Sequence, residues 1–163
     1  MHGMDRRERV SAADDAPSTE GPACVCWPDP GQAGWNGVQE RHDAVPDTVR
    51  AFRRRVRAWL DGGEIDEEIA ESILLVVDEA VTNAVEHACP DWDCAVRLVA
   101  GPRACGGGVS VLVSDNGVWK PRGDPGFRGR GIDLIGRLAQ RSSIEAGEQG
   151  TTVRMCWPVT SEG

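Results

Sequence analysis

The stretch ILLVVDEAVTNAVEHA, at residues 73–88, decides the fold of this chain. It is mainly apolar, but Glu79, Asn83 and His87 interrupt it at intervals of four residues. On an α-helix this spacing places the three side chains on one stripe, each a turn from the next. The apolar residues place the helix in a core, and a buried carboxylate without a partner is costly. We therefore expect the polar stripe to face a pocket.

Length, charge and hydropathy narrow the class of protein. The 163 residues fit one domain with its own core. The 18 Lys and Arg against 26 Asp and Glu give a net charge of −8, which argues against a general nucleic-acid binder. No apolar run approaches the roughly 20 residues of a membrane span, and no hydrophobic segment marks a secretory signal. We expect a cytoplasmic protein without nucleic-acid or membrane contacts, and reduced cysteines.

The composition divides the chain into a domain and two tails. Residues 1–37 are rich in Pro, Gly, Ala, Ser and Asp and show no amphipathic period, so we predict a flexible, disordered tail. The domain covers residues 38–158, and a short C-terminal tail covers residues 159–163. Trp27 and Trp35 lie in the first tail, where they either pack against the domain or contact a partner.

Apolar periodicity and turn residues predict three helices and five strands. The helices span about 46–61, 67–88 and 129–139, and the strands span about 37–43, 95–100, 109–113, 142–145 and 151–157. This order predicts an α+β fold: a two-layer α/β sandwich with one mixed, mostly antiparallel sheet and about three helices on one face. Five arginines between residues 50 and 57 form either a solvated helix face or a docking surface for an acidic partner.

Polar residues at the ends of these elements suit a nucleotide. Asp115 follows a core strand and can accept a hydrogen bond from the exocyclic amine of adenine, while Gly117 lets the base approach the backbone. The GRGI turn at residues 129–132 offers free helix N–H groups to phosphate, and Arg128 or Arg130 adds positive charge.

The polar stripe of the central helix supplies the remaining chemistry. Asn83 offers an oxygen to Mg²⁺, which prefers few protein ligands together with phosphate oxygens. Glu79, one turn earlier, is placed to activate the water or hydroxyl that attacks the γ-phosphate. His87 lies near the helix C-terminus, where a structural role fits as well as a ligand role.

Four motifs follow one another along the chain: DEAVTNAVEHA, DNG, GRGIDLI and GTTVRM. This set resembles the N, G1, G2 and Gly-Thr boxes of the Bergerat ATP-binding fold, which gyrase, Hsp90, histidine kinases and MutL share. Residues 39–158 resemble in particular the anti-sigma-factor serine/threonine kinases (RsbW-like). The 11 residues at 118–128 are short for the ATP lid of such proteins, with Gly123 and Gly126 as candidate hinges.

The resemblance implies a role for each motif residue. Glu79 would be the general base, Asn83 the Mg²⁺ ligand and Asp115 the adenine reader. Either Thr151 or Thr152 would close the adenine pocket. The remaining residues implied in ATP binding are His87, Gly117, Arg128, Gly129, Arg130, Gly131 and Ile132.

The resemblance also implies a function. Such kinases use ATP and Mg²⁺ to phosphorylate Ser or Thr of a small anti-anti-sigma (STAS-type) protein, sequester a sigma factor in another state, and act as homodimers. The alternative is a non-catalytic switch that uses ATP only to change its affinity for a protein partner. Glu79 favours catalysis, because a pure binder needs no base.

Overall fold

The computed structural model describes residues 8–10, 27–88, 93–104, 107–117 and 129–158. Its strands are β1 (Glu8–Val10), β2 (Val38–Asp43), β3 (Ala95–Pro102), β4 (Val109–Asp115), β5 (Arg141–Gly147) and β6 (Gly150–Trp157). Its helices are α1 (Pro46–Asp61), α2 (Glu67–Asn83) and α3 (Gly129–Leu138), and a π-helical turn, η1 (Ala84–Ala88), continues α2.

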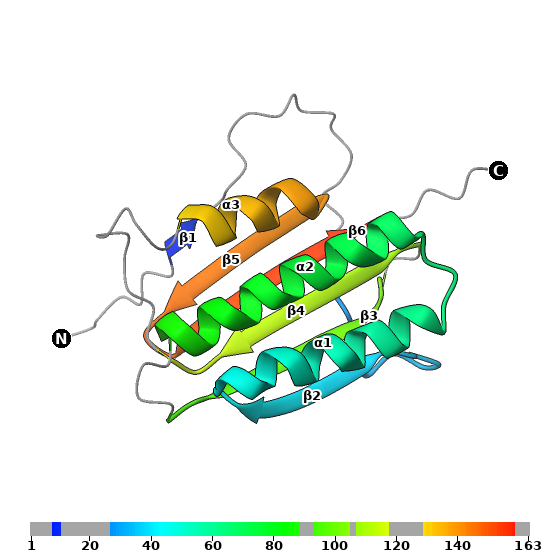
Figure 1. Cartoon of the computed structure of the whole chain (residues 1–163). Helices are drawn as coiled ribbons and strands as arrows, with labels where there is room; N and C mark the ends of the chain where they lie inside the picture. The colour runs from blue at the N-terminus through cyan, green and yellow to red at the C-terminus, as the bar shows by residue number, and fades with distance from the viewer. Residues whose placement is uncertain (1–7, 11–26, 89–92, 105–106, 118–128, 159–163) are drawn as a thin grey trace.

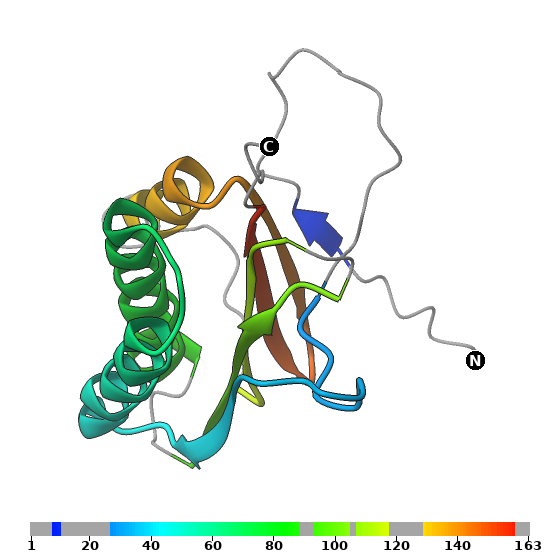
Figure 2. The same ribbon diagram turned by 90° about the vertical axis from the view of Figure 1, so that its right-hand side faces the viewer.

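The strands form one sheet in the order β1-β5-β6-β4-β3-β2. Every pairing within the described ranges is antiparallel. The three helices cover one face of this sheet, with α2 between α1 and α3 (Figures 1 and 2). The predicted α+β sandwich with about three helices on one face is confirmed, but the sheet is antiparallel at every described pairing and not mixed.

Helix α1 begins and ends where the sequence indicates. Pro46 occupies its first turn, where a missing N–H costs nothing. Phe52, Val56 and Leu60 recur at helical spacing and are buried against the sheet. The helix stops at Gly62, whose N–H donates to the Trp59 carbonyl at 3.2 Å.

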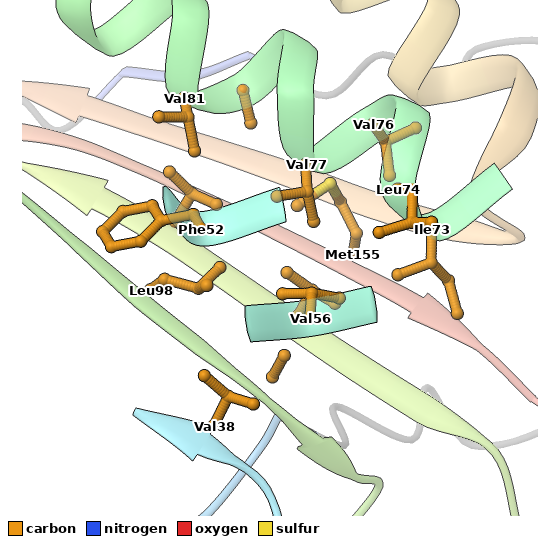
Figure 3. Close-up of a cluster of buried hydrophobic side chains, with 14 of the residues drawn as sticks. Val38, Phe52, Val56, Ile73, Leu74, Val76, Val77, Val81, Leu98 and Met155 are labelled. Carbon is orange, nitrogen blue, oxygen red and sulfur yellow. The ribbon is translucent and has the colours of Figure 1, made fainter. Parts of the chain in front are cut away.

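Helix α2 forms the centre of the core. Asp66 caps it by accepting a hydrogen bond from the Glu68 N–H at 2.9 Å. Its inner face buries Ile73, Leu74 and Val77 among side chains from α1 and the sheet, such as Leu98 and Met155 (Figure 3). Each fully buried side chain of this kind contributes about 1.5–3 kcal/mol.

The end of this helix differs from the prediction. The sequence predicts one continuous α-helix to residue 88, but the backbone changes to a π-helical turn at Ala84. The π-helical hydrogen bond closes over five residues instead of four, so the turn is wider. His87 lies within this turn and not within α2 itself.

Several of the five arginines of α1 form ion pairs with carboxylates of this chain, which the sequence does not predict. Three of the five ion-pair with residues on neighbouring elements, while Arg50 and Arg54 are exposed. The predicted solvated helix face therefore describes only some of these five arginines. The pairs are Arg53–Asp78, Arg55–Glu40, and Arg57 with Asp61, Glu67 and Glu71.

The segment 27–37 lies on the face of the sheet opposite the helices (Figure 2). The Arg154 guanidinium lies 5.3 Å from the centre of the Trp27 ring. The Trp35 ring covers Gly101, where a Cβ atom would come within 2.6 Å of the indole nitrogen. Trp27 and Trp35 therefore pack against the domain, which is the first of the two alternatives predicted from the sequence.

The two cysteines in the described part of the chain, Cys94 and Cys156, differ from each other. Cys94 is disulfide-bonded, so the prediction of reduced cysteines is wrong at this position. Cys156 is free and buried, as a small apolar side chain would be. Among the described helices, none has the length and apolarity that a membrane crossing requires.

Candidate functional site

Asp115 and Thr151 form a corner where β4 ends and β6 begins. The two residues are direct partners in the antiparallel ladder, so their side chains share the face of the sheet that carries the helices. Gly150, beside them, has a φ of 128°, and a Cβ there would lie 1.9 Å from the Asp115 carbonyl oxygen. Only glycine allows this approach of the two strands.

The Asp115 carboxylate is held by backbone donors. The Gly117 N–H donates to its Oδ1 at 2.9 Å, and the Thr151 N–H donates a second hydrogen bond. Burial raises the pKa of Asp115, and the two N–H groups offset part of that rise. The result is a fixed, partly desolvated acceptor, which is suited to a donor such as an amine.

The two candidate threonines lie on opposite faces. Thr151 is buried, and its hydroxyl has no hydrogen-bond partner among the described residues. Thr152 pairs with Ser114 and Glu145 on the other face of the sheet. The structure therefore brings Thr151, and not Thr152, together with Asp115.

An adenine ring fits this corner chemically. Its exocyclic amine can donate a further hydrogen bond to the Asp115 carboxylate, whose two oxygens accept more than the two backbone N–H groups supply, and its ring nitrogen is an acceptor for the Thr151 hydroxyl. An unsatisfied buried hydroxyl is costly, so a ligand that pairs with it gains affinity.

Glu79 and Asn83 are half-buried on the last turns of α2. The π-helical turn that follows Asn83 contacts both β4 and β6, which places the end of the helix over the strand ends. No group of three or more His, Cys, Asp or Glu in the described residues is arranged to hold a metal ion. A single amide oxygen is consistent with Mg²⁺ that is shared with phosphate oxygens.

The start of α3 lies at the same end of the molecule as the end of β4 and the end of α2 (Figure 1). Residues 129–132 form its first turn, so their N–H groups have no partners within the helix. The side chains of His87, Arg130 and Ile132 are outside the described part of the structure. Arg128 and the predicted lid, 118–128, lie outside the described residues altogether.

Two residues outside the predicted set shape the corner. Position 150 requires glycine because of its positive φ. The sequence indicates this role only by placing Gly150 directly before Thr151. The Asn116 side-chain oxygen accepts a hydrogen bond from the Ala95 N–H at 2.8 Å, which ties the DNG loop to β3. The sequence shows Asn116 only as a turn residue, because its partner is 21 positions away.

Comparison with known proteins agrees with this geometry. The sequence profile of the histidine kinase-like ATPase domain matches residues 43–157. No curated protein matches the chain.

Two solved structures share the fold. The RsbU and RsbW domains of Rv1364c from Mycobacterium tuberculosis superimpose with a TM-score of 0.61 at 25% identity, over 76% of this chain and 32% of that one. The histidine kinase domain of the Erythrobacter litoralis EL346 blue-light activated histidine kinase gives a TM-score of 0.52 at 23% identity, over 69% and 64%. This chain thus spans about a third of the first structure and just under two thirds of the second.

The profile match covers most of the chain and all four motifs. The fold agrees with the resemblance seen in the sequence. ATP binding is implied by this membership. The chain belongs to the histidine kinase-like ATPase domain family.

Proposed function

We propose that this protein is an ATP-dependent protein serine/threonine kinase that acts as an anti-sigma regulatory factor. Its substrate would be a small STAS-type anti-anti-sigma protein, and in another state it would sequester a sigma factor. The observation that carries the proposal is Glu79, which stands one helical turn before Asn83 on α2, just ahead of the π-helical turn that contacts β4 and β6. The likeness to the RsbW domain, at 25% identity, supports the same class.

The proposed chemistry assigns one task to each group. Asp115 and Thr151 bind the adenine and fix its orientation. The first turn of α3 receives the phosphates, and Asn83 would hold Mg²⁺, which would supply neutralising charge to the phosphate oxygens. Glu79 accepts the proton of the substrate hydroxyl as its oxygen attacks the γ-phosphorus, and ADP leaves.

Phosphotransfer to a STAS-type protein tests this proposal. The full chain is incubated with Mg²⁺, radiolabelled ATP and each STAS-type protein encoded in the same genome, and acid-stable phosphate is counted. We expect label on Ser or Thr of one of these proteins. Glu79→Ala should lower the transfer rate by about 10²–10⁴, as loss of a general base does, with ATP affinity unchanged.

The non-catalytic switch predicts a different result. In that case ATP changes the affinity for the STAS-type protein, but no label is transferred, and Glu79→Ala behaves like the unaltered chain. Glu86→Ala is the matched control, because Glu86 is an exposed glutamate just beyond Asn83 on the π-helical turn. Loss of transfer in both variants would remove Glu79 from the role of base.

A further inference from the structure

The helix layer has a hollow on its surface, separate from the nucleotide corner. Its volume is about 440 Å³, within the range of roughly 300–1,000 Å³ that is typical of binding pockets. None of the nucleotide-site residues named above lines it. The lining comes from all three helices: Arg53, Glu67, Glu68, Glu71, Ser72, Leu75 and Leu138.

Leucines form the apolar part of this groove. Leu75 has 42% of its surface exposed, and among the described residues it is the large apolar side chain that stands out to solvent. Leu138 reaches the groove from the end of α3 and is half-buried against the core. A single exposed leucine is ordinary, but a leucine that lines a hollow can receive an apolar side chain.

The groove is negatively charged. Three glutamates and one arginine line it. Arg53 is already paired with Asp78, and Arg57 nearby is shared between Glu67 and Glu71 at 2.9 and 2.7 Å. Within the described part of the chain the Glu68 carboxylate has no ion-pair partner. The excess of carboxylates favours a cationic occupant and opposes a nucleotide or nucleic acid.

The spacing of the lining residues fits a helix. Glu68, Ser72 and Leu75 lie on successive turns of α2, and together they form one ridge. An apolar groove beside such a ridge is the geometry in which an amphipathic helix docks. We propose that this groove docks a partner protein's amphipathic helix, with an aliphatic anchor on Leu75 and Leu138 and a lysine or arginine beside Glu68.

The groove lies away from the nucleotide motifs, so this proposal does not depend on phosphotransfer. The lining residues belong to the first half of α2 and the last residue of α3. Figure 1 shows that these parts lie at the opposite end of the two helices from the end of α2 and the start of α3, where the nucleotide motifs gather. A partner helix and a nucleotide are therefore bound at opposite ends of the same pair of helices.

A model peptide tests the groove directly. The probe is a short amphipathic helix of leucine and lysine, and the matched control replaces every lysine with glutamate. The full chain, labelled with ¹⁵N, is titrated with each peptide, and backbone amide shifts are followed. We expect the lysine peptide to shift the amides of Ser72, Leu75 and Leu138, and the glutamate peptide to shift none of them.

Variants locate the binding. Leu75→Ser should weaken the lysine peptide about tenfold, since an apolar anchor is lost, and Glu68→Lys about fivefold, since an exposed pair becomes a repulsion. Both side chains are exposed, so the fold survives. Glu64→Lys makes the same charge change at an exposed residue outside the groove and should leave the affinity within about twofold.

The proposal is overturned by either of two results. One is the absence of amide shifts at millimolar lysine peptide. The other is shifts spread over other acidic surfaces, with Glu64→Lys weakening the peptide as much as Glu68→Lys.

Discussion

Replacing Gly150 with alanine should destabilise the chain and weaken nucleotide binding together, because the glycine joins the fold to the site. Its φ is 128°, which side chains rarely adopt, and the new Cβ would lie 1.9 Å from the Asp115 carbonyl oxygen. Backbone strain of this kind costs about 1–3 kcal/mol, and forced overpacking adds about 1–3 kcal/mol. The relief is to move β6 away from β4, which separates Thr151 from Asp115.

The expected loss of stability in Gly150→Ala can be measured by thermal unfolding. For a chain of this length each kcal/mol lowers the Tm by about 2–4 °C, so Gly150→Ala should lower it by about 5–20 °C. Gly147→Ala is the matched control: Gly147 belongs to the same turn, and a Cβ there would have no atom within 4 Å. Circular dichroism melts of the three proteins without ATP provide the comparison. Equal Tm values for Gly150→Ala and the unaltered chain would refute the reasoning.

Three further predictions concern the site and the core. The stability of ligand-free Asp115→Asn relative to the unaltered chain should be higher at about pH 7 than at about pH 4, because burial raises the pKa of Asp115 and its ionisation lowers the stability of the unaltered chain alone; urea unfolding at both pH values checks this. Asn83→Ala should remove the Mg²⁺ dependence of ATP binding, and calorimetry with and without the metal measures it. Phe52→Ala should cost about 3–5 kcal/mol in urea unfolding, since the ring is fully buried.

The sequence predicts most of the fold because its signals are local. Pro46, Gly62 and the Asp66 cap define helix ends through their own backbone chemistry, and the structure has them in those places. Alternating apolar residues likewise predict β3 and β4. The disulfide at Cys94 is missed, because pairing depends on which segments meet in space.

The site is predictable in its motifs but not in its geometry. The ladder partner of Asp115 decides between Thr151 and Thr152, and that register is set by the whole sheet. The π-helical turn at Ala84 leaves no trace in the four-residue spacing of Glu79, Asn83 and His87. The first feature depends on strand pairing and the second lies where the end of α2 packs on β4 and β6, and no single stretch of sequence contains either.

The groove on the helix layer is also a feature that local sequence does not predict. Glu68, Ser72 and Leu75 lie on successive turns of α2. Only the packing of α1 and α3 beside α2 makes them the wall of a groove.

ATP binding by Asp115→Asn tests the central claim most directly. Isothermal titration of the full chain with ATP and Mg²⁺ should show saturable binding, and Asp115→Asn should weaken it at least about tenfold, since a hydrogen bond to a charged acceptor is lost. Asp133→Asn, at an exposed aspartate on α3, is the control and should bind ATP normally. Equal affinity of Asp115→Asn and the unaltered chain would contradict the placement of adenine at the corner of Asp115 and Thr151.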